Sequence, residues 1–404
     1  MNILSLSTYP IRARRYGGQR RIAAFADFYQ TLGATLHYAA AHIPTPGHPQ
    51  PVGPDDFAIR APHPRWDGVP FVGDIAAGEA AAEQPQAYQH FRRLIERIEP
   101  DLIQLDHPFM WPVVERARRD GLLGGVPLLY SSHNWEGPLK AQMLRAHLDA
   151  REAAEIGARI EAMEIAVVQS ASAIVAVSDA EAQTYRDLHP GVSVFVVLNG
   201  VDRPPAGIST NPAIIAPFQG RRYFYFVGSA YPPNSLGFGR LVLEKGLFFH
   251  PPTPFIALCG GAAQEVLKAP SYRRFQEAHE ARIRVFPNPS DADLWTLKMH
   301  AHAALLPIEF GGGSNLKTAE ALATENWIVG TSTAFRGFEA FENVAGVIKA
   351  DEPAAFRKAM AEVMHHPRLD LSEAERSKRA AVYWDRCFAD SGLEDFIRRL
   401  VAAA

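Results

Sequence analysis

Cysteine is scarce in this chain of 404 residues, which contains only Cys259 and Cys387. Two cysteines exclude a disulfide scaffold and are typical of proteins from a reducing compartment. The formal net charge is only −3, so the chain as a whole lacks the polycationic character of many nucleic-acid-binding proteins. There is also no uninterrupted apolar run of about 18 residues, the minimum for a membrane-spanning helix. The N-terminal MNILSLSTYP lacks the basic segment of a signal peptide, so we expect a cytoplasmic protein.

Short apolar runs alternate with helical patterns along the chain. A strand is expected at residues 2–6, followed by a helix over 20–32 and another strand at 36–40. A second series of strands begins at 223–227 and continues through 303–307. Strands that alternate with helices predict parallel sheets with helices on both faces, which is an α/β fold. The length of the chain is sufficient for two domains of this kind.

One segment separates the two series of strands. It reads LNGVDRPPAGISTNPAIIAPFQG, residues 198–220, and its Pro, Gly and Asn content without periodicity is typical of an interdomain linker. We therefore predict an N-terminal domain over residues 1–203 and a C-terminal domain over 204–384. We expect residues 385–404 to form a last helix that packs back on the N-terminal domain. Residues 41–70 are a Pro-rich insertion with little regular pattern, and loops of that length are usually functional or mobile.

The most informative segment is PIEFGGGSNLKTAEAL, which places three glycines, Lys317 and Glu320 between two apolar runs. Consecutive glycines let the backbone approach a ligand closely, and a glycine-rich turn that opens a helix usually binds phosphate. Lys317 adds a positive charge, and Glu320 can accept hydrogen bonds from sugar hydroxyls. A P-loop is an alternative, although the second glycine of G-x-x-x-x-G-K-[ST] is missing and the segment lies late in the chain. A glycine-rich turn without a ligand is another.

Landmarks over most of the chain resemble the family 4 glycosyltransferases of the GT-B fold, in which two Rossmann-like domains face each other across a cleft. They are YGG after the first strand, YSSHN at the end of another strand, VSDAEAQTY, VLNGVD, FVGSAYPPNSLGF, CGG, and GGGSNLKTAEAL with RGFE. Each is weak alone, and their shared order is distinctive. The resemblance implies a metal-independent, nucleotide-sugar-dependent hexosyltransferase with a saccharide or lipid-linked saccharide acceptor. It also implies a role in bacterial polysaccharide or glycolipid assembly.

The resemblance implies a role for each matching residue. It places His133 at the anomeric carbon of the donor sugar. The first of the two glutamates of retaining members falls at Gly312 here, and Glu309 is expected to replace it. The implied donor-binding residues are Gly17, Gly18, Ser229, Phe286, Pro287, Gly311, Gly312, Gly313, Ser314, Asn315, Leu316, Lys317, Thr318 and Glu320. Because that glutamate is missing, the resemblance favours retaining transfer only weakly. An inverting transferase and a non-catalytic sugar-nucleotide-binding protein remain as alternatives.

Charged residues elsewhere have two interpretations each. Five arginines fall within ten residues near the N-terminal glycines, with no acid between Met1 and Ala26: Arg12, Arg14, Arg15, Arg20 and Arg21. Such a cluster is usually a solvated face, and beside a transferase site it predicts contact with an anionic acceptor or the inner face of a membrane.

Asp291 and Asp293 have the D-x-D spacing that other glycosyltransferases use for a metal. Ser290 is a good N-cap, and acids favour the first turn of a helix. We therefore interpret this segment as the start of a helix and expect neither a metal nor a resident cofactor.

Overall fold

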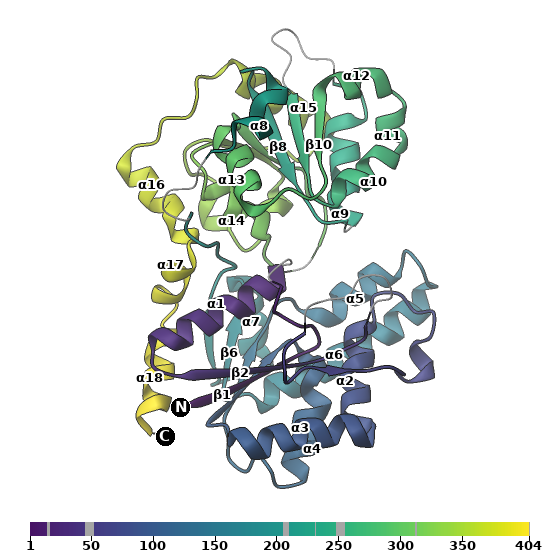
Figure 1. Ribbon diagram of the computed structural model, residues 1–404, viewed down its shortest axis with the longest axis vertical. Coiled ribbons are helices and arrows are strands. Elements are labelled where there is room, and N and C mark those ends of the chain that lie inside the picture. The colour runs from purple at the N-terminus through teal and green to yellow at the C-terminus, as the bar shows by residue number, and fades with distance from the viewer. Residues whose placement is uncertain are drawn as a thin grey trace. The chain divides into compact units, whose positions relative to one another are not determined.

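The computed structural model describes residues 1–13, 17–44, 52–204, 210–230, 232–247, 255–311 and 313–403. The chain forms two compact units, one of residues 1–198 with 388–404 and the other of residues 199–387. Each unit contains one parallel sheet with helices on both faces (Figure 1). The predicted α/β class is therefore confirmed.

The sheet of the first unit has seven strands. Their order is β3 (Phe57–Ala58), β2 (Thr35–His42), β1 (Asn2–Ser7), β4 (Leu102–Asp106), β5 (Leu128–Ser131), β6 (Ala173–Ala176) and β7 (Ser193–Val196). The helices are α1 (Gly17–Thr31), α2 (Gly73–Glu83), α3 (Pro85–Ile98), α4 (Trp111–Arg119), α5 (Glu136–Leu144), α6 (Ala150–Ser170), α7 (Asp179–Leu188) and α18 (Leu393–Ala403). The strand order reverses between β1 and β4, and ligands of open α/β sheets bind at the carboxyl ends of the strands beside such a reversal.

The second unit repeats this plan. Its strand order is β10 (Ile283–Phe286), β9 (Phe255–Cys259), β8 (Tyr223–Val227), β11 (Ala303–Leu306), β12 (Trp327–Gly330) and β13 (Val347–Lys349). The helices are α8 (Pro212–Ile215), α9 (Pro232–Gly237), α10 (Ala262–Lys268), α11 (Pro270–Arg273), α12 (Gln276–Arg282), α13 (Asp291–His300), α14 (Leu316–Leu322), α15 (Pro353–His365) and α16 (Glu373–Arg379). Here the order reverses between β8 and β11.

The C-terminal segment of the chain belongs to the first unit. Phe388 stacks on Phe28 of α1 with ring centroids 4.3 Å apart, and Phe396 of α18 lies 5.4 Å from Phe195 of β7. Helix α17 (Trp384–Ala389) spans the division between the units. The units divide after residue 198 rather than after the predicted residue 203, and the chain returns at residue 388 rather than 385.

The second half of the predicted linker is not an irregular connection but part of the second unit. Asn211 caps α8, because its side chain accepts a hydrogen bond from the backbone of Ala213. Phe218 is almost fully buried and stacks on Tyr223 with ring centroids 3.9 Å apart. Pro and Asn therefore begin a short helix here, and the aromatic side chain that follows joins the core of the second unit. None of the described helices combines the length and the apolar character needed to cross a bilayer.

Candidate functional site

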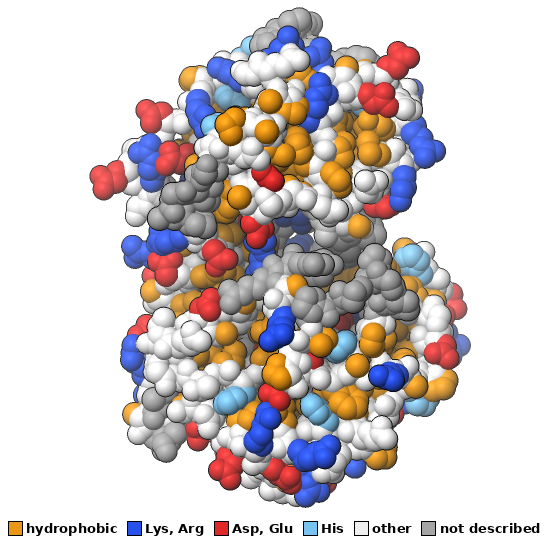
Figure 2. Space-filling view, in the orientation of Figure 1, with side chains coloured by type: hydrophobic (Ala, Val, Ile, Leu, Met, Phe, Trp, Pro, Cys, Tyr) orange, Lys and Arg blue, Asp and Glu red, His pale blue; other side chains and the backbone are white. Residues whose placement is uncertain are grey.

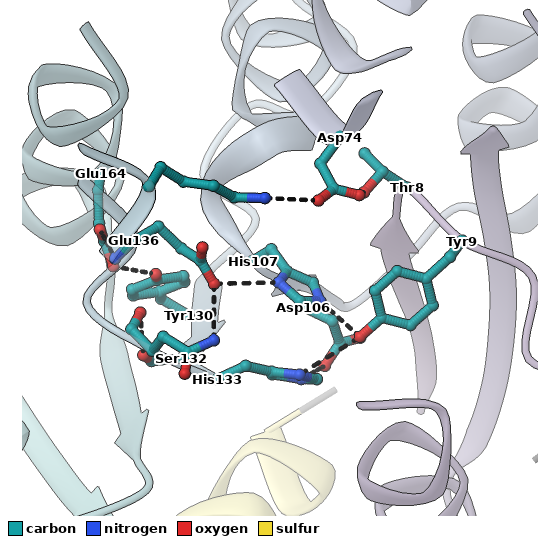
Figure 3. Close-up of polar contacts among 12 residues, drawn as sticks. Thr8, Tyr9, Asp74, Asp106, His107, Tyr130, Ser132, His133, Glu136 and Glu164 are labelled. Carbon is teal, nitrogen blue, oxygen red and sulfur yellow. Dashed lines mark hydrogen bonds and ion pairs between the residues drawn. The ribbon is translucent and has the colours of Figure 1, made fainter. Parts of the chain in front are cut away.

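Polar side chains gather in the first unit where β1, β4 and β5 end (Figure 3). Tyr9 follows β1, Asp106 ends β4, His107 follows it, and His133 follows β5. These strands flank the reversal of strand order, so their carboxyl ends meet at one edge of the sheet. The topology thus brings together residues that are far apart in the sequence.

A tyrosine hydroxyl lies between the two histidines of this cluster. Tyr9 Oη is 2.5 Å from His107 Nε2 and 3.3 Å from His133 Nδ1. The His107 Nδ1 atom has no hydrogen-bond partner among the described residues and lies 3.8 Å from Glu136 Oε1. Gly18 leaves the necessary space, because a Cβ there would lie 2.2 Å from Tyr9 Oη and 3.2 Å from His133 Nδ1. The glycine is therefore required by close packing.

Burial sets the electrostatic state of His133, whose exposed fraction is 8%. Burial, together with the charges of His107 and Arg21, lowers the pKa of His133 well below its usual value. The imidazole is therefore neutral at neutral pH. Its Nε2 atom has no hydrogen-bond partner among the described residues and lies 4.0 Å from Asp106 Oδ1. Such a group can form one hydrogen bond with a ligand without carrying a charge.

Hydrogen bonds from buried side chains fix the loop that carries this histidine. Ser132 Oγ lies 2.5 Å from Tyr185 Oη. The fully buried Glu164 of α6 accepts hydrogen bonds from Tyr130 Oη at 2.6 Å and from the backbone N–H of Glu136 at 2.7 Å. These contacts join β5, the loop after it and the start of α5 to α6.

A second polar group lies beside the first (Figure 3). The carboxylate of Asp74 on α2 accepts hydrogen bonds from Thr8 Oγ1 and from Lys140 Nζ of α5, each at 3.1 Å. Burial raises the pKa of Asp74, but the opposing charges of Lys140 and His107 and these two hydrogen bonds together lower it. Asp74 is therefore ionised at neutral pH.

The predicted site lacks five of these residues: Tyr9, Asp74, Asp106, His107 and Lys140. The first strand runs directly into Tyr9, and the apolar run 102–105 runs directly into Asp106 and His107, so a polar residue at a strand end was the available signal. Asp74 and Lys140 lie on helices and have no comparable signal in the sequence.

In the second unit, the glycine-rich segment follows β11. Gly311 and Gly313 have φ angles of +141° and +58°, a region that favours glycine. Gly312 lies outside the described residues. Buried Ser314 Oγ and Asn315 Nδ2 have no hydrogen-bond partner among the described residues. The segment thus holds polar atoms that the described part of the chain leaves unsatisfied.

Two cations accompany this segment. Arg336 Nε donates a hydrogen bond to the carbonyl oxygen of Gly313 at 2.6 Å. Burial lowers the pKa of Lys317, and the negative charge of Glu320 opposes that effect. Glu320 also forms an ion pair with Lys298 at 2.8 Å. One carboxylate therefore interacts with two lysines.

The other predicted donor-binding residues have varied surroundings. Leu316 is the first residue of α14, and the hydroxyl of Thr318 donates to the carbonyl oxygen of Ala334 within the fold. Ser229 follows β8, where its Oγ accepts a hydrogen bond from Asn234 Nδ2 at 3.3 Å.

At the neighbouring strand ends, half-buried Phe286 ends β10 and Pro287 after it is exposed. Glu309 forms an ion pair with Arg240 at 2.5 Å. Arg240 lies in the π-helix Phe238–Leu243.

The N-terminal arginines do not form a single surface cluster. Arg12 is exposed, Arg20 is half-buried, and Gly17 at the start of α1 is exposed. Arg21 is 1% exposed and donates a hydrogen bond to the carbonyl oxygen of Val197 at 2.8 Å. The prediction that Arg21 lies on a solvated face is wrong. Its guanidinium is buried inside the first unit, where it binds a backbone carbonyl group. Arg14 and Arg15, like Tyr16, lie outside the described residues.

The D-x-D segment begins a helix, as predicted. Ser290 Oγ accepts a hydrogen bond from the backbone N–H of Asp293 at 3.1 Å, and α13 starts at Asp291. Within the described ranges, no group of three or more His, Cys, Asp or Glu residues is arranged to hold a metal ion.

Residues 16–203 match the family described as Glycosyltransferase Family 4. The structure is similar to sucrose-phosphate synthase from Thermosynechococcus elongatus, with a TM-score of 0.70, 14% identity and 100% of both chains covered. It is also similar to Anabaena HepE in complex with UDP-glucose, with a TM-score of 0.58, 15% identity, and 100% of this chain and 98% of that chain covered.

A third similar structure is an α,α-trehalose-phosphate synthase from Burkholderia xenovorans in complex with glucose-6-phosphate. Its TM-score is 0.59, with 14% identity, and 99% of this chain and 100% of that chain are covered. No curated protein matches the sequence. At these identities the likeness shows the fold, and the predicted GT-B architecture of two Rossmann-like units is confirmed.

Proposed function

Because residues 16–203 match glycosyltransferase family 4 and the whole chain has the GT-B fold, we propose that this protein transfers a sugar from a nucleoside-diphosphate sugar to a hydroxyl of a saccharide. The solved structures that it resembles support this reaction class, since one of them is a complex with UDP-glucose and another a complex with glucose-6-phosphate. We further propose that transfer retains the anomeric configuration, needs no metal and serves bacterial polysaccharide or glycolipid assembly.

One observation carries the proposal. The glycine-rich segment after β11 contains glycines with positive φ angles. It also contains polar atoms of Ser314 and Asn315 that have no partner among the described residues. The neighbouring cations are Lys317 and Arg336. A buried polar atom without a partner costs about 1–3 kcal/mol. A diphosphate supplies acceptor oxygens for these donors and negative charge for both cations, so its binding removes that cost.

The proposed roles follow from the position of each group. Lys317 and Arg336 stabilise the negative charge that develops on the departing nucleoside diphosphate. Glu320 accepts hydrogen bonds from the ribose hydroxyls, and Phe286 lies beside the base. Neutral His133 donates one hydrogen bond to a hydroxyl of the transferred sugar, which positions its anomeric carbon.

Calorimetry with nucleoside diphosphates tests the proposal directly. We expect one of UDP, GDP, ADP and dTDP to bind the wild-type protein. Lys317→Ala removes a charge-assisted contact worth about 1.5–3 kcal/mol and weakens that binding about tenfold or more. Lys268→Ala is the matched control, because Lys268 is an exposed lysine of the same unit that pairs with Glu265. If no diphosphate binds, or if both variants behave alike, the proposed donor site is wrong.

A non-catalytic sugar-nucleotide-binding protein is the second candidate. The ion pair between Glu309 and Arg240 favours it, because that pair neutralises the carboxylate expected to contact the donor sugar. Both candidates predict diphosphate binding. Incubation of the protein with the matching nucleotide sugar separates them, because only an enzyme releases free diphosphate through transfer or slow hydrolysis.

A contact with the membrane surface is a finer part of the same proposal. Arg12 is exposed on the connection between β1 and α1, and half-buried Arg20 lies near the start of α1. We propose that these arginines, together with Arg14 and Arg15, meet a lipid-linked saccharide acceptor at the inner face of the membrane. Each surface arginine adds about 1 kcal/mol of attraction to an anionic membrane. Co-sedimentation with anionic vesicles at low and high salt measures that attraction, and salt-independent binding contradicts it.

A further inference from the structure

Phe71 is an exposed aromatic residue in an unfavourable backbone conformation. Its exposed fraction is 37%, and its φ angle is +60°, in the left-handed region that favours glycine. A non-glycine residue there costs about 1–3 kcal/mol, and such residues concentrate at ligand-binding sites. Exposure of the ring adds an unfavourable hydration term. The ring packs only partly, against the imidazole of His147, among the residues that the structure describes.

The position of Phe71 is fixed by the second polar group of the candidate site. Its carbonyl oxygen accepts a hydrogen bond from Lys140 Nζ at 2.9 Å, and the same Nζ donates to Asp74 at 3.1 Å. Asp74 in turn accepts from Thr8 Oγ1. Figure 3 shows Thr8 and Asp74 on the same side of the cluster as His107. The backbone of Phe71 is thereby linked through Lys140 to a partly exposed, ionised carboxylate, and its ring lies 5.3 Å from that of His147.

We propose that Phe71 and Asp74 form an acceptor subsite for an uncharged saccharide unit. The inference rests on the proposed transferase function and names the chemistry of its acceptor. A pyranose has a face of C–H groups that packs on an aromatic ring, and it has equatorial hydroxyls that donate to a carboxylate. His107 Nδ1, buried and without a partner among the described residues, supplies a further polar contact for a hydroxyl.

The charges at this subsite disfavour a phosphorylated sugar unit. The ionised carboxylate of Asp74 carries negative charge there. Lys140 is the cation in contact with Asp74, and its ammonium group is already bonded to that carboxylate and to the carbonyl oxygen of Phe71. A phosphate placed here meets a like charge and finds its nearest ammonium group already committed, which disfavours binding. The subsite therefore differs in charge from one that takes glucose-6-phosphate.

Acceptor kinetics with paired variants test the subsite. The donor is the nucleotide sugar identified by diphosphate binding, and the acceptors are glucose, galactose, N-acetylglucosamine, maltose and glucose-6-phosphate. We expect the uncharged saccharides to exceed glucose-6-phosphate at least tenfold in kcat/KM. Phe71→Leu keeps an apolar side chain and loses the flat ring, so we expect its acceptor KM to rise about five- to tenfold. Phe71→Tyr keeps the ring, so we expect it to retain the wild-type acceptor KM.

Several controls keep the outcomes distinct. Met299→Ala removes another exposed large apolar side chain and should leave every constant unchanged. Diphosphate affinity and donor hydrolysis should be the same in all Phe71 variants, and Asp74→Asn should raise acceptor KM while denaturation confirms that it folds. Preference for glucose-6-phosphate, or an unchanged KM in Phe71→Leu, overturns the subsite. A wild-type protein without transfer or hydrolysis overturns the proposed function itself.

Discussion

Gly18→Ala is the sharpest test of the geometry around His133. The backbone of Gly18, the second residue of α1, is not in the left-handed region, so alanine is compatible with its conformation. In an open position this change favours the helix by up to about 1 kcal/mol. Here the new Cβ lies 2.2 Å from Tyr9 Oη and 3.2 Å from His133 Nδ1. Any loss of stability therefore reports the clash.

The magnitude follows from what holds the tyrosine. Its hydroxyl must move by roughly 1 Å to restore an ordinary contact, and it is bonded to His107 at 2.5 Å. Overpacking of this kind costs about 1–3 kcal/mol. After subtraction of a helix preference of about 1 kcal/mol, we expect a net destabilisation of up to about 2 kcal/mol. A displacement of about 1 Å at the reacting groups lowers turnover roughly 10²-fold.

Denaturant unfolding and steady-state turnover measure the two effects, and diphosphate calorimetry should show unchanged donor affinity. Gly125→Ala is the control, because a Cβ at Gly125 meets no atom within 4 Å. Tyr9→Phe removes the clashing oxygen, so the Gly18→Ala/Tyr9→Phe double variant should recover part of the lost stability, which makes the two changes non-additive. If Gly18→Ala is as stable and as active as wild type, the packing described around His133 is wrong.

Three further changes test other parts of the molecule. His133→Ala should lower turnover about 10²-fold and leave donor binding intact, and wild-type turnover would return this histidine to a packing role. Glu320→Ala should weaken free diphosphate binding, whereas Glu309→Ala should lower turnover alone, and equal effects on binding contradict the two roles. Burial raises the pKa of Glu181 from 4.5 to about 7, so its protonated form stabilises the fold below pH 4.5, and that stability is lost as the pH rises through 7. Glu181→Gln should therefore gain up to about 3 kcal/mol over wild type between pH 4.5 and 8 in denaturant unfolding, and parallel pH profiles contradict this.

The strands were predictable because parallel sheets bury both faces of each strand. The stretch over β4 reads LIQLD, and all five residues are buried. Such strands are near-continuous apolar runs in the sequence, and their alternation with helices predicts the α/β class. The turn at Gly311 and Gly313 was also predictable. Consecutive glycines indicate a backbone with positive φ angles, and both residues adopt that conformation.

Contacts between distant residues were not predictable. Arg21 lies in a basic stretch that is typical of a solvated face, yet it bonds to the backbone of Val197 across 176 positions of sequence. Helix α2 reads GDIAAGEAAAE and is buried almost all round, so it lacks the one-sided apolar pattern that marks a surface helix. The ion pair between Lys298 and Glu320 joins helices α13 and α14, and its two residues are 22 positions apart in the sequence.

The same limit applies to the first unit's site. Tyr9 and His133 lie 124 positions apart, and only the order of strands in the sheet brings them together. A resemblance between short sequences can identify His133, because that residue follows a recognisable strand. It does not identify a residue such as Asp74. The role of Asp74 depends on a hydrogen bond that it accepts from Lys140, which lies on another helix.

Charge, rather than topology, distinguishes the two candidate sites. Both sheets reverse their strand order after the third strand from one edge, so both present a ligand-binding edge of the same design. The first unit places neutral imidazole and carboxylates there, with Lys140 bonded to Asp74. The second places Lys317 and Arg336 beside unsatisfied donors. On the face of the molecule in Figure 2, charges of both signs lie interspersed over each unit. The distinction is therefore local. It underlies our proposals that an anionic diphosphate binds at the second edge and that an uncharged, hydroxyl-rich acceptor binds at the first.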